Sequence, residues 1–139
     1  MDRFLFKGVP RKSPKDKSVK YYATPVKTGT ITTEDLAKEI AGRCSLTYGD
    51  MLNVFRNLVE VIPKYLSAGF HINIRDLGII HLALSSEGAE EAAKLTADYI
   101  RKLTFHMYFS KHFKTAVLQE THFEKQAEKK SKTDGESGS

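Results

Sequence analysis

The sequence predicts an α+β fold, because the spacing of its apolar residues changes from helical to extended and back to helical once along the chain. Two amphipathic stripes with helix-start signals lie in residues 32–66, three extended runs lie in residues 70–109, and one short amphipathic stripe follows. A length of 139 residues with 40% hydrophobic content suits one compact core and is too short for two ordinary domains.

Each of the first two helices is predicted from a threonine that precedes an aspartate by three residues, which is the spacing of a capping box. The pairs are Thr32 with Asp35 and Thr47 with Asp50. Apolar residues then recur every three or four positions, which predicts a short helix over about 33–44 and a longer one that ends before Gly69. Pro63 lies inside the second helix, where it lacks an N–H group, so we expect a bend there.

The strands are predicted from a change to alternating apolar and polar residues after the second helix. One run reaches Ile74, a turn follows at residues 76–78, and a second run reaches Leu84, so the two runs form a hairpin. Residues 85–98 have no strand pattern and form a shortened arm, and residues 99–109 are the third extended run.

A short helix and a short strand are expected near the end of the chain. Ser110 is a suitable N-cap for a helix from Lys111 to about Leu118. His122 and Phe123 add a final extended pair.

Composition divides the chain into three parts. Residues 1–28 form a basic N-terminal extension with eight Lys or Arg against two Asp, and residues 29–123 form the folded domain with ten basic and eleven acidic residues. Residues 124–139 hold four of each and no apolar residue larger than alanine, so we expect a disordered tail. The basic excess therefore lies in the extension, which favours an anionic partner such as nucleic acid.

Two short runs in the extension, residues 4–6 and 21–26, are rich in strand-forming residues. Between them, residues 8–20 contain two prolines among basic residues, which predicts an irregular loop. Pro25 confines the second run to a sheet edge or a strand end. Tyr21 and Tyr22 are candidates for base stacking, although paired tyrosines in a short strand more often pack a ring against the core.

The sequence contains no catalytic motif. Its five histidines lie in different predicted elements, and it has no P-loop, GxGxxG or GxSxG motif. The single cysteine, Cys44, lies on an apolar helix face and cannot form a disulfide within the chain. We therefore expect no enzyme activity, no cofactor, no metal and no small-molecule substrate. No apolar run approaches the roughly 20 residues of a membrane span, so we expect a cytoplasmic protein without a membrane partner.

Three motifs occur in a fixed order along residues 31–117. They are the paired helix starts TTEDL and LTYGD, the hairpin GFHINIRDLGII at 69–80, and the ending MYFSKHFKTAV at 107–117. Together they resemble the bacterial HU and IHF family of architectural DNA-binding proteins. With its extension, the chain is similar to the larger HU-related proteins.

The resemblance implies two N-terminal helices, a three-stranded antiparallel sheet and a C-terminal helix in an intertwined dimer, whose β arms clasp DNA through the minor groove. The residues themselves also favour an obligate dimer, because two amphipathic helices and one hairpin leave more apolar surface than one short chain can cover. Four aromatic residues are expected in the dimer core, namely Phe105, Tyr108, Phe109 and Phe113.

The chain departs from the family pattern at the arm and at three single positions. Asp76, Phe109 and Ser110 replace a glycine, a proline and a glycine of the family motifs. The family arm is basic with a proline at its tip, whereas residues 85–98 hold four acidic residues, one lysine and no proline. Clasping of the minor groove is therefore not expected from this arm.

The candidate DNA-binding residues form three basic groups. Lys111 and Lys114 match basic positions of the family and lie on one side of the last helix near its N-terminus, where an anion is favoured. The second group lies in the extension and comprises Arg11, Lys12, Lys15, Lys17 and Lys20. The third comprises Arg101 and Lys102, which point to opposite faces of one strand, so that at most one of them shares a patch with Arg75.

We expect a homodimer that binds double-stranded DNA without catalysis and with little sequence preference, through phosphate contacts, at the bacterial nucleoid. The alternative is a structural or protein-interaction module that keeps the HU-like dimer and has lost DNA binding, which the acidic arm favours. A continuous basic face joining residues 11–20 with Lys111 and Lys114 would favour DNA, and a broken one would favour the module.

Overall fold

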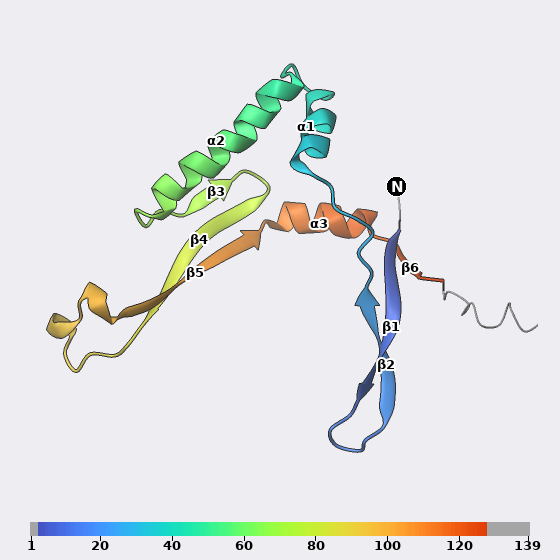
Figure 1. Cartoon of the computed structure of the whole chain (residues 1–139), viewed down its shortest axis with the longest axis horizontal. Coiled ribbons are helices and arrows are strands. Elements are labelled where there is room, and N and C mark those ends of the chain that lie inside the picture. Colours follow the sequence, from blue (N-terminus) through green and yellow to red (C-terminus); the bar gives the residue numbers. More distant parts are fainter. Residues whose placement is uncertain (1–2, 128–139) are drawn as a thin grey trace, which may run out of the picture. The chain divides into compact units, whose positions relative to one another are not determined.

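The computed structural model describes residues 3–127 and has the mixed α+β composition that the sequence predicts. Its described residues divide into two compact units (Figure 1). The extension unit consists of residues 3–30 and 120–127, and the helix–sheet unit consists of residues 31–119. The part of the predicted tail from residue 128 onward lies outside the described residues.

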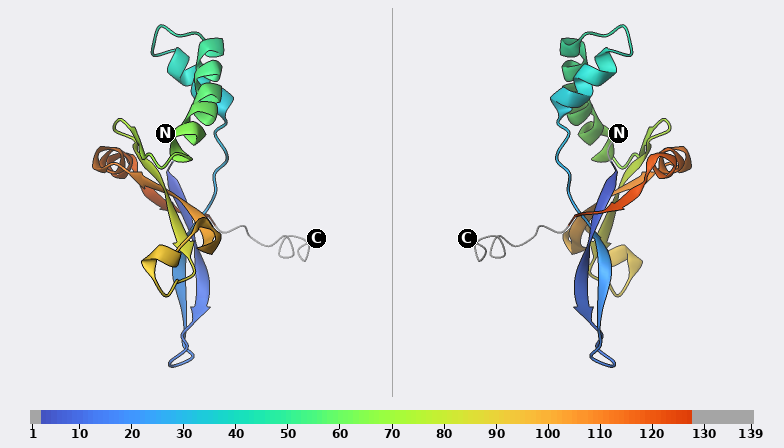
Figure 2. Two further views of the ribbon diagram at one scale, coloured as in Figure 1. Left: turned by 90° about the vertical axis from the view of Figure 1, so that its left-hand side faces the viewer. Right: turned by 90° about the vertical axis from the view of Figure 1, so that its right-hand side faces the viewer.

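The extension unit is a three-stranded sheet with the strand order β2–β1–β6. β1 (Phe4–Lys12) pairs antiparallel with β2 (Val19–Pro25), and β6 (Phe123–Lys125) pairs parallel with the start of β1. Pro25 ends the edge strand β2, as expected. The long β1–β2 hairpin is visible in all three views of Figures 1 and 2.

Two sequence predictions about this unit are wrong. The predicted irregular loop over residues 8–20 is mostly strand. β6 pairs only with Phe4–Phe6, so the side of β1 that faces away from β2 is an open edge at Pro10. A proline is tolerated on such an edge. Glu124 and Lys125, assigned to a disordered tail, belong to β6 and pair with β1. Composition alone does not reveal this pairing, because β1 lies more than a hundred residues away in the sequence.

The helix–sheet unit begins with α1 (Thr33–Ala41) and α2 (Tyr48–Leu66). Both predicted capping boxes are present: Thr32 Oγ1 accepts a hydrogen bond from the backbone N–H of Asp35 at 3.2 Å, and the Asp35 carboxylate accepts one from the N–H of Thr32 at 3.0 Å. The backbone hydrogen bond from Thr32 holds the pKa of Asp35 below its usual value, and Asp50 is held in the same way.

The end of α1 differs from the prediction, whereas α2 ends before Gly69, as predicted. α1 ends at Ala41 rather than near Cys44, because the chain caps the helix at Gly42. α2 continues through Pro63 and ends at Leu66. Pro63 lies in the last turn, where it cannot donate a hydrogen bond to the carbonyl of Val59, and the helix ends three residues later.

A second antiparallel sheet has the order β3–β4–β5. Its strands are β3 (Ile72–Ile74), β4 (Gly78–Ser86) and β5 (Ile100–Phe109), and α3 (Lys111–Glu120) follows directly. The arm between β4 and β5 contains two short 3-10 turns, at Ala92–Lys94 and Ala97–Tyr99.

The register of this sheet separates an apolar face from a polar face. In an antiparallel ladder, directly opposite residues share a face. The apolar face carries Ile72, Ile74, Ile80, Leu82, Leu84, Leu103, Phe105, Met107 and Phe109. The polar face carries His71 beside β3, and Asn73, Ile79, His81, Ala83, Ser85, Lys102, Thr104, His106 and Tyr108.

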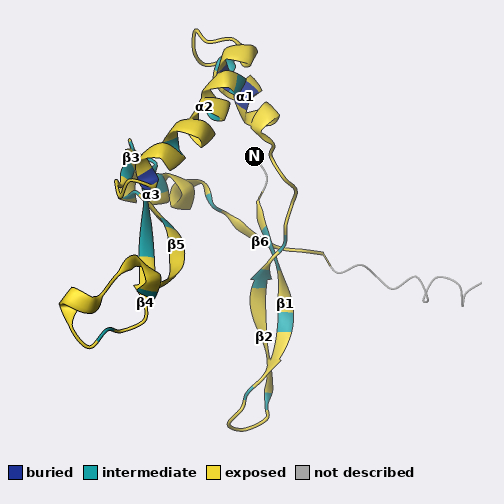
Figure 3. Ribbon diagram, turned by 60° about the vertical axis from the view of Figure 1, so that its left-hand side comes forward, coloured by how far each residue is buried: buried dark blue, intermediate teal, exposed yellow. Residues whose placement is uncertain are grey.

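The single chain buries few of its apolar side chains (Figure 3). Among the described residues, the buried hydrophobic ones are Ala37, Met51 and Leu66. On the apolar face of the sheet, Phe105 is 73% exposed, and Val59 of α2 is 74% exposed. The apolar face and one side of α2 therefore remain open in one copy of the chain.

Candidate nucleic-acid interface

The β1–β2 hairpin carries a basic face. Arg11 lies directly opposite Lys20, and the next pair on the same face is Val9 with Tyr22. The Arg11 guanidinium lies 5.8 Å from the centre of the Tyr22 ring, a cation–π contact that fixes the cation over the strand. Lys12 lies on the opposite face of the hairpin. Arg11, Lys12 and Lys20 thus lie on paired strands and not, as predicted, in an irregular loop.

A six-residue loop, Ser13 to Ser18, closes this hairpin and carries two exposed lysines, Lys15 and Lys17. The Asp16 carboxylate accepts hydrogen bonds from the Ser18 hydroxyl at 2.8 Å and from the Ser18 N–H at 3.1 Å. These bonds, that from the hydroxyl first, lower the pKa of Asp16 below its ordinary value. The single carboxylate of the loop is thus used to hold the turn, and the lysines are left to solvent.

The start of α3 is tied to the β3–β4 turn. Ser110 Oγ accepts a hydrogen bond from the Phe113 N–H at 3.1 Å, which confirms Ser110 as the N-cap, and its hydroxyl donates to the carbonyl of Asp76 at 2.6 Å. Asp76 adopts a φ of 59°, in the left-handed region that glycine and aspartate tolerate best. Two of the departures from the family motif therefore contact each other and keep the turn.

Lys111 and Lys114 are both exposed in the first turns of α3. Nearby, Gly78 allows β4 and β5 to approach closely, since an added Cβ atom would lie 2.2 Å from the carbonyl oxygen of Tyr108. Lys111 and Lys114 are therefore positioned by three features: the helix cap at Ser110, its hydrogen bond to the β3–β4 turn, and the close approach of β4 to β5.

The third predicted group does not form one patch. Lys102 lies opposite Ser85 at the arm end of the sheet, while Arg75 lies in the turn beside Gly78. Seven residues of β4 separate these ends, which corresponds to about 23 Å. The register therefore places Arg75 and Lys102 at opposite ends of the sheet, which agrees with the expectation that at most one of Arg101 and Lys102 shares a patch with Arg75.

Two of the predicted cations are paired with carboxylates. Arg101 forms an ion pair with Glu87 across the base of the arm, and Arg75 Nε lies 3.9 Å from the Asp76 carboxylate. Both pairs are solvent-exposed and therefore weak. Lys102 forms no ion pair within residues 3–127.

The polar face of the sheet has a feature that the prediction of DNA contacts missed. The rings of His71, His81 and His106 stack in sequence, with centroids 4.9 Å and 5.2 Å apart, and Tyr108 stacks on His81 at 5.1 Å. We call these three histidines the imidazole row. Part of the signal was present in the sequence, because the alternation after α2 places His71 and His81 opposite the apolar residues.

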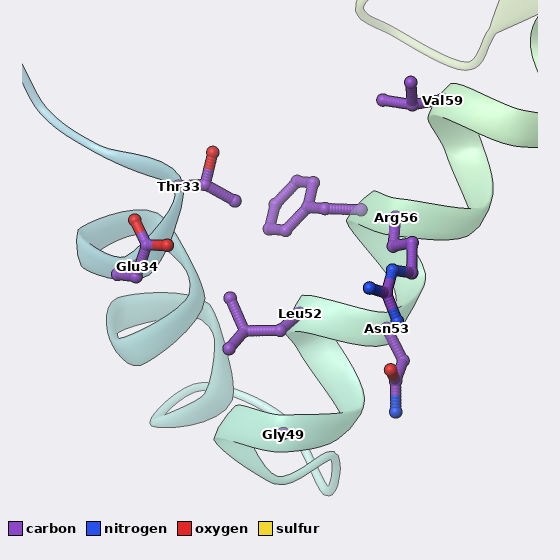
Figure 4. A pocket seen from close by; sticks show the side chains of 8 residues that line it. Thr33, Glu34, Gly49, Leu52, Asn53, Arg56 and Val59 are labelled. Carbon is purple, nitrogen blue, oxygen red and sulfur yellow. The ribbon is translucent and has the colours of Figure 1, made fainter.

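An open groove of about 690 Å³ lies between α1 and α2 (Figure 4). Leu52, Phe55 and Val59 supply its apolar lining, and Glu34, Asn53 and Arg56 are among its polar residues. Across the described residues, 3–127, no group of three His, Cys, Asp or Glu side chains could hold a metal ion. The described helices include none that is long and apolar enough to cross a membrane.

The fold and the exposed cations define an α+β protein of the HU class. A family model, "HU-HIG: HU domain fused to wHTH, Ig, or Glycine-rich motif", matches residues 3–125. The chain belongs to this HU-HIG family, and the predicted resemblance is confirmed.

One solved structure from Bacteroides vulgatus ATCC 8482 is described as a "Putative bacterial DNA binding protein". It is similar to this chain with a TM-score of 0.63 and 14% sequence identity over 95% of the chain, which shows a shared fold. The chain spans 52% of that structure's length. Among curated proteins, none matches the sequence.

Proposed function

We propose that this protein binds double-stranded DNA without catalysis and with little sequence preference, as an HU-like architectural protein of the bacterial nucleoid. The observation that carries the proposal is the match to an HU-domain family over residues 3–125. The exposed cations on the β1–β2 hairpin and at the start of α3 support it, because lysine and arginine contacts to phosphate supply most non-specific affinity for DNA.

The proposed phosphate contacts come from both units. The β1–β2 hairpin contributes Arg11, Lys12, Lys15, Lys17 and Lys20, and the helix–sheet unit contributes Lys111, Lys114 and Lys102. Arg75 and Arg101 are secondary candidates, because DNA phosphates must compete for them with Asp76 and Glu87. In this division, residues 1–28 act together with the HU-like domain, residues 29–123, and are more than a linker to it.

We also propose that the DNA-binding form is a homodimer. In one chain, large apolar side chains are exposed on the sheet, on α2 and on α3; examples are Phe105 at 73%, Val59 at 74% and Leu118 at 72%. Contiguous apolar faces of this kind are rare on monomers, and a second copy of the same fold covers them symmetrically.

The second candidate function is a protein-interaction module that keeps the dimer and has lost DNA binding. Its supporting observation is the arm, residues 85–98, which carries four acidic residues, Glu87, Glu90, Glu91 and Asp98, and one cation, Lys94. The negative charge of this arm repels DNA phosphates, whereas it would attract a basic surface of a partner protein.

Fluorescence anisotropy of two unrelated labelled duplexes, measured over a range of salt concentrations, tests the choice. DNA binding predicts similar affinities for both duplexes and a steep loss of affinity with added salt. It also predicts tighter binding by the Glu90→Lys/Glu91→Lys variant, because repulsion from the arm is removed. If neither the wild-type protein nor the Glu90→Lys/Glu91→Lys variant bound DNA at low salt, the result would favour the protein-interaction module.

A further inference from the structure

We propose that the imidazole row is a phosphate-binding site whose affinity depends on protonation, so that the protein takes up protons when it binds DNA. This inference rests on the proposed function and adds to it a site and a condition under which the site works. The row lies on the polar face of the β3–β4–β5 sheet, which also carries Lys102.

The geometry brings three imidazoles into one line across the sheet. His81 on β4 and His106 on β5 are directly opposite each other in the ladder, and their ring centroids are 5.2 Å apart. His71, just before β3, continues the line with a centroid 4.9 Å from that of His81. The planes differ by 29° and 23°, so the rings stack face to face. His71 is exposed and the other two are half-buried, so the row is open to a ligand.

The surroundings of the row favour an anion. The ten residues of the polar face include no aspartate or glutamate, and they include the cation Lys102. The Tyr108 ring, stacked on His81, is the other titratable group of the face. The adjoining elements contribute Glu60, Lys64 and Tyr65 in the last two turns of α2, and the ion pair of Arg75 with Asp76 in the β3–β4 turn.

A metal ion is a poorer occupant than phosphate. Stacked rings do not direct three nitrogen atoms at one point, and no group of three His, Cys, Asp or Glu side chains within the described residues could hold a metal ion. A phosphate group makes no such demand, because its several oxygens can each accept a hydrogen bond from a different ring.

Protonation and phosphate binding reinforce each other at this row. A neutral imidazole has one N–H donor and a protonated one has two, and histidine ordinarily changes charge between about pH 5 and 8. Positive charges on rings about 5 Å apart would repel one another. A phosphate beside the row offsets this repulsion, so bound DNA favours the protonated row and a lower pH favours bound DNA.

The test is the affinity for a labelled duplex, measured by anisotropy at constant salt from about pH 8 to about pH 5.5, the range in which histidine ordinarily titrates. We expect the wild-type affinity to rise by up to about tenfold per pH unit for each proton taken up. The His71→Gln/His81→Gln/His106→Gln variant should lose most of this slope. His122→Gln, a histidine of the extension unit, is the matched control and should keep it.

The outcomes separate this proposal from the proposed function. Wild-type protein that binds DNA with the same pH slope as the triple variant would overturn the row and leave DNA binding intact. Absence of DNA binding at every pH would overturn both.

A second measurement does not depend on the variant folding. In wild-type protein, NMR titration of the histidine ring protons should show the row taking up protons at higher pH with duplex than without, and His122 unchanged. Identical curves would overturn the proposal. If inorganic phosphate alone shifts the row and duplex does not, the row is a site for free phosphate and the assignment to DNA is overturned.

Discussion

The chain contains two long hairpins that end in loops of opposite charge. The β1–β2 hairpin closes with residues 13–18, which carry two lysines and one aspartate, and the β4–β5 hairpin closes with an arm whose tip, residues 87–98, carries four acidic residues and one lysine. In the HU family that this chain resembles, the arm after the second strand is the basic element. In this chain basic residues also lie at a hairpin tip, but the hairpin is β1–β2, which precedes the HU-like helices in the sequence.

The two loops are also held differently. The short loop is closed by backbone hydrogen bonds from the Ser13 N–H to the Ser18 carbonyl and from the Lys17 N–H to the Ser13 carbonyl, and by the Asp16 carboxylate. The arm is held at its base by the Glu87–Arg101 ion pair and by the hydrogen bond from the Glu87 N–H to the carbonyl of Tyr99. In one hairpin the carboxylate shapes the turn and leaves the lysines free, and in the other a carboxylate neutralises an arginine. Fold similarity therefore does not by itself transfer the DNA-contacting role to the arm.

The largest effect is expected from disrupting the proposed dimer. Phe105→Asp places a charge on the apolar face of β5, where we propose that a second copy packs, and should destabilise the folded dimer by more than about 3 kcal/mol, because a buried carboxylate there has no partner. The expectation that Tyr108 belongs to the dimer core with Phe105 is wrong, because the register places Tyr108, which is 61% exposed, on the opposite face of β5; Tyr108→Asp should therefore leave the dimer intact. Sedimentation equilibrium measures the oligomeric state of both variants, and circular dichroism measures their stability. If both variants were folded monomers, or both lost the same stability, the assignment of the dimer interface to the apolar face would be wrong.

The next effect compares the hairpins directly. Replacing Arg11, Lys15, Lys17 and Lys20 with Gln should flatten the plot of log affinity against log salt by about 3.6 per chain, since each phosphate contact contributes about 0.9. Lys94→Gln on the arm is the control and should leave the slope nearly unchanged. If the arm variant had the larger effect, the assignment of charge to the β1–β2 hairpin would be wrong.

A smaller effect is expected at α3. Lys111→Ala/Lys114→Ala should weaken binding to unrelated duplexes equally and flatten the same plot by about two per chain. Lys38→Ala on α1 is the control for removing an exposed helical lysine. An unchanged slope in the α3 variant would mean that the extension carries the phosphate contacts without the helix–sheet unit.

Local signals predicted the helices and the second sheet well. The threonine–aspartate pairs mark both helix starts because a capping box is complete within four residues, and the alternation after α2 fixes both faces of the β3–β4–β5 sheet. The same alternation placed His71 and His81 on the outer rows, but the stack with His106 depends on the register between β4 and β5.

Long-range pairing accounts for most of what the sequence did not predict. Basic residues and prolines made residues 8–20 look irregular, yet cross-strand pairing with β2 makes most of them strand. β6 depends on a partner strand at the other end of the chain. The separation of Arg75 from Lys102 and the pairing of Arg101 with Glu87 likewise follow from the register and the arm, which no local pattern encodes.

The smallest effect concerns Asp16 and the shape of the basic loop. Hydrogen bonds from Ser18 lower the pKa of Asp16 from its ordinary value of 3.8. Because the folded pKa is depressed, the contribution of this carboxylate to loop stability is fully present above that ordinary value and is lost as the pH falls through the lower folded value.

The chemical shift of the Ser18 amide proton, followed by NMR during acid titration, should therefore change at a lower pH than the one at which a free aspartate protonates. The Asp16→Asn variant should lose this transition while keeping the strand pairs of β1 and β2. A Ser18 amide that titrates at the ordinary aspartate value would show that the carboxylate does not hold the turn. The basic loop would then be held by its backbone hydrogen bonds and not by its carboxylate.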